Sequence, residues 1–423
     1  MIQKELLKRI IVESAHFIES LSRRMVPREG LVLPRREGKV IVLYGLRRSG
    51  KTFMLYSLFR RSPDTSLYVD FEDDRLYDFG PSDFESLREA FYELRPEVVG
   101  RGPWFLLDEV QKVEGWEAFA RRMVERGEAK VAVTGSSSKL GPLEVKSVLR
   151  GRDWTIEVLP FSFREVLRAE GMEISQDLIY GLDRAKAVHF FEEYLFWGGF
   201  PEVVLAPPED KRKIVREYLD ALFFKDLVER FEVTNLPLLK ALREALFSSF
   251  ASKFSLTSFF RKARGKFPFS KDTLYRYYDH FLEAMLIFEV RMFTPSPYQR
   301  LRNPPKIYLA DNALALRVGT RDRGRLLENI VYLELRRRGY ELHYFKGRGE
   351  CDFVAVKDGQ KELYQVTLAL QDNLPREVGG LVEAATVLGL RRGFIITLEE
   401  ERRLVDKGVE VIVVPAWKWL LAL

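Results

Sequence analysis

The chain has 423 residues, with 68 Lys and Arg against 62 Asp and Glu, for a formal net charge of +6. This length allows about two to four domains with cores of their own, and the mild positive charge favours an acidic partner such as nucleic acid. One cysteine (Cys351) excludes an internal disulfide framework, and four scattered histidines argue against a structural zinc site.

No apolar run in the sequence is long enough to span a membrane. We therefore expect a cytoplasmic protein that does not interact with membranes. Few Asn and Gln beside abundant Glu, Arg and Lys are typical of a thermophile.

The first segment, residues 1–36, is predicted to form an amphipathic helix and an irregular strap. Apolar residues between Leu6 and Leu21 recur on one helical stripe with charges between them, which is not the pattern of a signal peptide. The stretch from Met25 to Glu37 carries prolines and arginines and leads into the first strand.

The most informative motif runs from Lys39 to Thr52, KVIVLYGLRRSGKT. A β-branched run predicts a buried strand before the glycines, and apolar spacing predicts a helix after them. In a P-loop, backbone N–H groups surround phosphates, the lysine reaches the β and γ oxygens, and the hydroxyl residue ligates Mg²⁺. We expect the residues that hold a nucleotide to be Gly45, Arg48, Ser49, Gly50, Lys51, Thr52 and Phe53.

A second apolar strand, Pro103 to Leu107, is followed by Asp108 and Glu109. Carboxyl ends of strands in open α/β sheets are where ligands bind. We assign Asp108, with Thr52, to the Mg²⁺ shell, and Glu109 to polarising the attacking water, with Lys51 as a further catalytic group. A strand that ends in two acids by chance is the alternative.

The remaining strands of residues 37–160 are predicted at Ser66 to Phe71, Lys130 to Thr134 and Trp154 to Val158, with helical crossovers between them. Ser136, after the strand that ends at Thr134, could be a sensor of the γ-phosphate, or the serines could only cap a helix. Arg150 and Arg152 could act as a finger or sensor, or could lie on a solvated face.

Residues 161–235 read as a helical lid and residues 236–320 as a winged helix. The third helix of the winged helix carries basic and aromatic side chains suited to DNA: Lys271, Tyr275, Arg276 and Tyr277. These residues could instead be core and solvated surface.

The last segment, residues 321–423, has the order αβββαβ of a small α/β domain. This order should bring four polar residues close together: Glu328, Glu350, Asp352 and Gln365.

The motifs together resemble those of archaeal and bacterial P-loop ATPases of the AAA+ or STAND type (AAA_14-like) with a C-terminal DUF4143 domain. The resemblance is carried by GLRRSGKT, VDFEDDRL, FLLDEVQKVEGWE, VTGSSS, LRGR, PFSFREV, GGFPE, KIYLADNAL and LENIVYLEL. It implies ATP as the nucleotide, a turn that places Pro201 next to it, and a final domain similar to PD-(D/E)xK nucleases.

The final domain departs from an active nuclease of that kind. Such a nuclease needs an acid on the second strand and an acid and a lysine on the third. Glu328 and Asp352 fit, but the third strand reads Gln365-Val366-Thr367. Unless Lys346 or Glu350 takes over these roles, the domain is expected to be degenerate.

The sequence thus predicts an ATP-hydrolysing switch whose C-terminal half binds DNA or a protein, with oligomers allowed. Two other hypotheses remain open. One is an ATP-regulated, metal-dependent nuclease that cleaves DNA with Glu328 and Asp352. The other is an ATP-binding signalling scaffold that recognises a protein.

Overall fold

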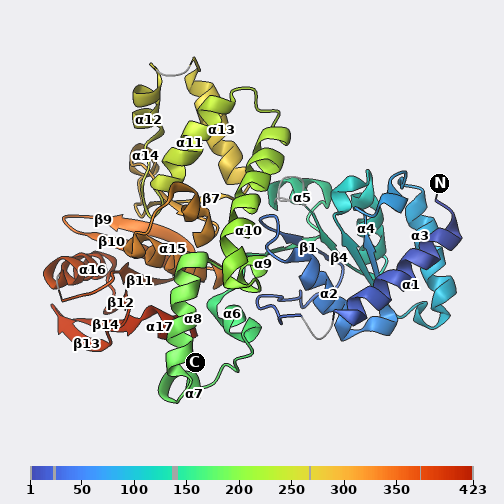
Figure 1. The fold of residues 1–423 in the computed structure, drawn as a ribbon, viewed down its shortest axis with the longest axis horizontal. Coiled ribbons are helices and arrows are strands. Elements are labelled where there is room, and N and C mark those ends of the chain that lie inside the picture. The colour runs from blue at the N-terminus through green and yellow to red at the C-terminus, as the bar shows by residue number, and fades with distance from the viewer. Residues whose placement is uncertain (1, 22–24, 136–141, 266–267, 372, 422–423) are drawn as a thin grey trace. The chain divides into compact units, whose positions relative to one another are not determined.

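The computed structural model describes residues 2–21, 25–135, 142–265, 268–371 and 373–421. They form two compact units, Met1–Leu159 and Pro160–Leu423 (Figure 1). The first unit ends one residue before the predicted end of the ATPase core. Within the described ranges, no helix combines the length and the apolarity that a bilayer span requires.

The first unit is built on a parallel sheet of five strands in the order β2-β3-β4-β1-β5. The strands are β1 Val40–Tyr44, β2 Ser66–Asp70, β3 Trp104–Asp108, β4 Lys130–Thr134 and β5 Asp153–Glu157. The α-helices are α1 Lys4–Ser20, α2 Lys51–Arg61, α3 Asp83–Leu94, α4 Trp116–Glu125 and α5 Pro142–Val148. Short 3₁₀ turns are η1 Pro63–Thr65, η2 Asp74–Leu76, η3 Pro96–Val98 and η4 Val110–Lys112. The predicted parallel α/β fold is confirmed.

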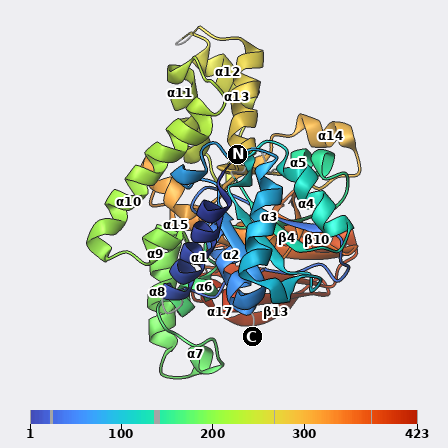
Figure 2. The same cartoon turned by 90° about the vertical axis from the view of Figure 1, so that its right-hand side faces the viewer.

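Two apolar layers cover the two faces of this sheet. Val40 and Val42 pack into one layer and Ile41 and Leu43 into the other, because successive side chains of a strand point to opposite faces. Helix α1, which lies beside α3, contributes to the first layer, and α2 contributes to the second (Figures 1 and 2). Burial on both faces explains the continuous apolar run of β1.

The second unit contains one mixed sheet of nine strands in the order β13-β14-β12-β11-β10-β9-β7-β8-β6. The strands are β6 Ser252–Lys253, β7 Ile287–Met292, β8 Lys306–Leu309, β9 Glu341–Lys346, β10 Glu350–Lys357, β11 Gln360–Val366, β12 Arg392–Thr397, β13 Arg402–Asp406 and β14 Val409–Pro415.

Helices and short turns precede, connect or follow the strands of that sheet in the chain. They are α6 Phe163–Ala169, α7 Asp177–Tyr180, α8 Arg184–Trp197, α9 Pro201–Val204, α10 Pro208–Ala221, the π-helical η5 Leu222–Glu229, α11 Leu236–Ser248, α12 Leu256–Ala263, α13 Lys271–Glu283, α14 Pro297–Arg302, the 3₁₀ turns η6 Asn312–Val318, α15 Arg323–Arg337, α16 Leu374–Leu388 and α17 Ala416–Leu421.

The sheet of the second unit joins two segments that the sequence assigns to separate domains. Strand β7 pairs in parallel with β9, through Arg291 with His343 and Met292 with Tyr344. The predicted division at residue 320 therefore falls within one unit. The apolar periodicity of each segment cannot predict that two strands about 50 residues apart in the chain pair with each other. The edge strand β13 was not predicted, because its exposed, charged residues do not alternate as a half-buried strand does.

Candidate functional site

Polar side chains of the first unit gather at the carboxyl ends of four neighbouring strands. The P-loop follows β1, Asp70 ends β2, Asp108 ends β3 and Thr134 ends β4. Because the strands are parallel and Asp70 is in register with Asp108, these ends share one edge of the sheet. The structure therefore brings both predicted motifs to the same place.

The P-loop has a backbone that only glycine can adopt at its first position. A Cβ on Gly45 would lie 2.3 Å from the carbonyl oxygen of Val158. The loop then passes through positive φ angles at Arg48 (61°) and Gly50 (98°) before α2 begins at Lys51. The unpaired N–H groups of the first turn of α2 thus point toward the loop, as anion binding requires.

Lys51 and Ser49 give the loop polar groups suited to phosphate. Lys51 is 6% exposed, and its Nζ donates hydrogen bonds to the carbonyl oxygens of Gly45 and Leu46, both at 3.1 Å. The hydroxyl of Ser49 is fully buried and has no hydrogen-bond partner among the described residues. A buried ammonium and an orphaned hydroxyl beside a helix N-terminus fit a bound triphosphate.

Asp108 is held in one orientation by hydroxyl groups from the neighbouring strands. The hydroxyl of Tyr68 donates to Asp108 Oδ2 at 2.8 Å, and Thr134 Oγ1 donates to Asp108 Oδ1. The N–H of Glu109 donates to Thr134 Oγ1 at 3.2 Å, which ties the two acids together. Sequence reasoning missed Tyr68, whose partner is visible only once β2 and β3 are paired.

Burial raises the pKa values of the two other acids at this edge, Asp70 and Glu109. Burial raises the pKa of Asp70 to about 6. The N–H of Glu72 donates a hydrogen bond to Asp70 Oδ1 at 2.8 Å, which lowers this pKa but does not outweigh burial. Burial also raises the pKa of Glu109, while a 2.5 Å hydrogen bond from Gln111 Nε2 and the charge of Lys51 lower it. A raised pKa makes the Glu109 carboxylate a better proton acceptor.

Arg28 links the N-terminal strap to the P-loop. Its Nη1 donates to the carbonyl oxygen of Ser49 and its Nη2 to that of Leu159, both at 2.7 Å. Trp154 Nε1 also donates to the carbonyl oxygen of Val32 in the strap, at 2.8 Å. Nothing in the sequence distinguishes Arg28 from the other arginines of the strap.

The structure does not bring Arg152 to this edge. Arg152 precedes β5, where its carbonyl oxygen accepts from the N–H of Val40 at the start of β1. The P-loop follows the other end of β1, about 13 Å away at ~3.3 Å per residue. Arg152 Nε instead contacts Glu125 Oε1 at 3.3 Å. The expectation of a sensor in the same chain is corrected on this ground, and a role in a neighbouring copy stays a prediction.

Other predicted site residues remain predictions. Ser136 lies outside the described residues. Thr52 and Phe53 lie in the first turn of α2, where Phe53 is 43% exposed with its ring edge-on to Tyr56. Pro201 begins α9 in the second unit.

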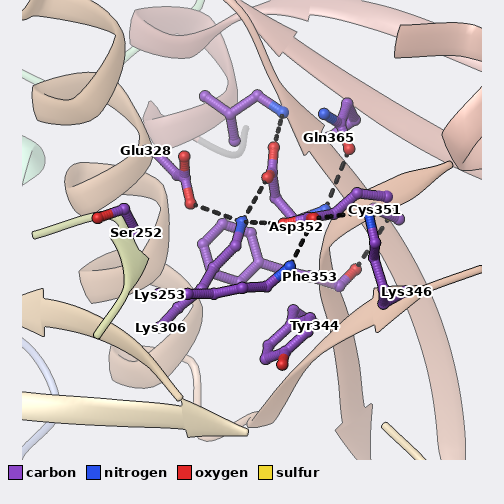
Figure 3. A network of polar contacts seen from close by, with 12 residues as sticks. Ser252, Lys253, Lys306, Glu328, Tyr344, Lys346, Cys351, Asp352, Phe353 and Gln365 are labelled. Carbon is purple, nitrogen blue, oxygen red and sulfur yellow. Dashed lines mark hydrogen bonds and ion pairs between the residues drawn. The ribbon is translucent and has the colours of Figure 1, made fainter. Parts of the chain in front are cut away.

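A second polar site, in the Pro160–Leu423 unit, is centred on Lys306 of β8 (Figure 3). Its Nζ lies 2.8 Å from Asp352 Oδ1, 3.2 Å from Glu328 Oε1 and 3.3 Å from Glu350 Oε1. Gln365 Oε1 accepts from the N–H of Asp352 at 3.0 Å. The four residues predicted to be neighbours do come together, but the lysine between them was missed.

Lys306 and the carboxylates around it shift one another's pKa values. Burial alone would lower the pKa of Lys306, but Asp352, Glu328 and Glu350 raise it well above its usual range. Burial and the charge of Asp352 raise the pKa of Glu328 to about 7, although Lys306 and the Tyr308 hydroxyl, at 2.6 Å, oppose this. Among the described residues, no group of three or more His, Cys, Asp or Glu side chains is arranged to hold a metal.

Two motifs of the second unit, GGFPE and KIYLADNAL, fit against each other. Asp311 accepts hydrogen bonds from the N–H groups of Gly199 and Ala313, at 2.7 and 2.8 Å. A Cβ on Gly198, where φ is +74°, would lie 1.7 Å from Asp311 Oδ1. Burial raises the pKa of Asp311 to about 7. These contacts give the two motifs a structural role.

Comparison with known sequences identifies the family. Residues 37–167 match the model of an AAA domain (AAA_14). Over 438 aligned residues, the chain is 31% identical to the uncharacterized protein MJ1544 of Methanocaldococcus jannaschii, covering 100% of this chain and 96% of that protein. The chain belongs to the family of MJ1544. Residues 37–167 are thus similar to AAA-type P-loop ATPases, a family whose members bind and hydrolyse nucleotides.

The chain is also similar to an uncharacterized protein of Haemophilus influenzae, with 27% identity over 393 residues that cover 90% of this chain and 92% of that protein. Among solved structures, the Walker-type ATPase PABY2304 of Pyrococcus abyssi is similar with a TM-score of 0.43 and 14% identity, over 76% of this chain and 96% of that one.

The comparisons correct one expectation. Residues 188–323 match a domain of unknown function, DUF8612, and not DUF4143.

Proposed function

We propose that this protein is a Mg²⁺-dependent ATPase whose nucleotide state controls how residues 160–423 hold a partner, with DNA as the first candidate. The observation that carries the proposal is the shared sheet edge at which Lys51, Asp108 and Glu109 meet, within a domain of a nucleotide-hydrolysing family. A P-loop alone would explain binding, whereas a fixed acid pair at the same edge supports hydrolysis.

Each residue has a distinct task in this proposal. The N–H groups of the P-loop and the ammonium of Lys51 bind the phosphates of ATP. Thr52 and Asp108 would hold Mg²⁺, which when bound neutralises charge on the phosphate oxygens. Glu109 orients the attacking water and accepts its proton, and the hydrogen bond from Gln111 limits the orientations of its carboxylate.

The test is steady-state ATP hydrolysis with two site variants and one control. Lys51→Ala should lose nucleotide binding. Glu109→Gln should still bind ATP but hydrolyse it at least about a hundredfold more slowly, the lower range for a lost general base. Glu97→Gln changes an exposed glutamate of η3 in the same way and should leave the rate unchanged. Wild-type turnover by Glu109→Gln would refute the assignment.

The order α11, β6, α12, α13, β7, β8 supports the proposal of a winged helix that contacts DNA. On α13, Lys271, Tyr275 and Arg276 are exposed, with Lys271 Nζ 5.5 Å from the centre of the Tyr275 ring. Tyr277 is only 2% exposed, so its expected contact with DNA is corrected to a core position.

Titrating the ATPase assay with single-stranded, duplex and branched DNA tests the partner. Stimulation by one form that is lost in Lys271→Glu would support DNA. A flat response would instead favour a protein partner and the signalling-scaffold hypothesis.

We further propose that the C-terminal strands form a binding module and not a nuclease. The support is that Lys306 already occupies the space between Glu328, Glu350 and Asp352. Plasmid incubated with Mg²⁺ or Mn²⁺ should stay intact. Nicking that persists in Lys51→Ala and disappears in Asp352→Ala would refute this and favour the ATP-regulated nuclease.

A further inference from the structure

A cavity of ≈290 Å³ lies in the second unit between the end of α8, one face of α10, the end of η6 and the residues that follow it. This volume is at the lower end of the range of small-molecule sites, about 300–1,000 Å³. All its lining residues fall between Phe196 and Arg321, within the segment that matches the domain of unknown function. None of the residues assigned to ATP or to the Lys306 cluster contributes to it.

The lining of this cavity is strongly basic. Four of its eleven residues are arginines, and none is Asp or Glu. Arg317 lies 3.6 Å from Glu244 Oε1. The other three, Arg212, Arg216 and Arg321, are exposed and make no ion pair with any residue that the structure describes. Three guanidinium groups around one cavity repel one another, and a bound anion that accepts hydrogen bonds from them would offset this repulsion.

The same cavity presents aromatic and apolar surface. Phe196 and Trp197, the last two residues of α8, line it with rings 5.1 Å apart, and both are only partly buried. One face of α10 contributes both charged and apolar side chains to the cavity. Their i, i+3, i+4, i+7 spacing places them on the same side of the helix: Arg212, Val215, Arg216 and Leu219. An inorganic anion would use the arginines but not this surface.

We propose that the cavity, which we call the Trp197 pocket, binds one nucleotide unit. Its base would pack on Trp197 or Phe196, and its phosphate would accept hydrogen bonds from Arg212, Arg216 and Arg321. Stacking of bases on aromatic rings beside cationic side chains is the common way of holding single strands without sequence preference. The nucleotide can be free or part of a single-stranded nucleic acid, because both present the same base and phosphate.

The Trp197 pocket would give the second unit of the proposed ATPase a ligand. Only the coupling of this ligand to ATP hydrolysis rests on the proposed function. Binding itself is therefore measured in the Lys51→Ala protein, in which the P-loop no longer contributes. Fluorescence anisotropy of a labelled oligothymidylate reports strand binding, and calorimetric titration with AMP reports free nucleotide.

Three variants in this background test the site. Arg216→Glu with Arg321→Glu should weaken binding by roughly tenfold or more per arginine, since about 1.4 kcal/mol corresponds to tenfold. Trp197→Ala should weaken it without a change of charge and reduce the quenching of tryptophan fluorescence by the ligand. Arg391→Glu, an exposed arginine outside the pocket, is the matched control and should have no effect beyond a small electrostatic one.

The outcomes distinguish a nucleic-acid strand from a free nucleotide as the ligand, and both from the absence of a binding site. Oligonucleotide binding lost in the pocket variants supports a strand, and AMP binding lost in the same variants supports a free nucleotide. Absence of both, or binding that Arg391→Glu weakens as much as the pocket pair does, overturns the proposal. Since ATP hydrolysis is measured separately in the chain with Lys51 intact, failure of the pocket and failure of the ATPase are distinguishable.

Discussion

Replacement of Lys306 by methionine would leave the buried carboxylates of Glu328 and Asp352 without their cation, whereas Glu350 would keep its ion pair with Lys253. The Lys306 side chain is 5% exposed, and those of Asp352 and Glu328 are 9% and 13% exposed. Removal of one partner from a buried ion pair costs about 3–5 kcal/mol, because the remaining charge is uncompensated. We expect Lys306→Met to lower the free energy of unfolding by about this much, which for a unit of this size lowers the Tm by roughly 10 °C.

Lys253→Met is the matched control within the same cluster. Lys253 lies 2.7 Å from Glu350 Oε2, but both side chains are about 30% exposed. Ion pairs that solvent screens in this way contribute about 0–1 kcal/mol to the free energy of unfolding, so Lys253→Met should lose no more than that. Chemical denaturation followed by far-UV circular dichroism at pH 8 measures both variants.

Acid should partly rescue Lys306→Met. Burial and the charge of Asp352 already raise the pKa of Glu328 to about 7 in the folded state, against the opposing charge of Lys306, and loss of that lysine raises it further. The folded variant therefore binds protons that the unfolded chain releases, so its stability rises as the pH falls from 8 toward 5. If Lys306→Met loses no more than Lys253→Met, or shows no such rise, Lys306 does not balance this cluster.

Three further predictions concern other positions. Gly45→Ala should weaken ATP binding about 10- to 100-fold in a nucleotide titration, because its Cβ would meet the Val158 carbonyl oxygen at 2.3 Å; unchanged affinity would contradict the loop geometry. Gly198→Ala should cost about 3 kcal/mol of unfolding free energy, since it combines a positive φ with a clash against Asp311; a neutral result in denaturation would contradict the packing of the two motifs. The pKa of Asp70 is raised to about 6, so its contribution to stability falls as the pH rises from about 4 to 6. Asp70→Asn should remove this slope from a plot of Tm against pH, and parallel plots for the two proteins would refute it.

The P-loop and the acid pair could be predicted because phosphate chemistry fixes residue types at short, local spacing. Gly45 directly follows β1, Asp108 ends β3, and Lys51 begins the helix that follows the loop, and the apolar runs of both strands are visible in the sequence. The position of Arg152 could also have been predicted correctly: a residue just before a parallel strand lies at the amino edge of the sheet, away from the ligand edge.

Other features depend on segments that meet only in three dimensions. Tyr68 reaches Asp108 from a strand that begins about 40 residues earlier, and Lys306 reaches Asp352 from a strand on the other side of β7 and β9. Neither partner follows from spacing, because the pairing of strands decides it. The apolar members of α13 show the same limit, since an aromatic such as Tyr277 fits a core or a binding face equally well in the sequence.

The parallel pairing of β7 with β9 limits how the second unit can move. Backbone hydrogen bonds join these strands, so a rotation of α11–α13 carries β9–β14 with it unless that ladder breaks. A ligand held by the helices and one held by the C-terminal strands would thus undergo the same displacement. An ATP-driven change in this protein would therefore act on both as a single rigid body, with hinges only outside the nine-stranded sheet.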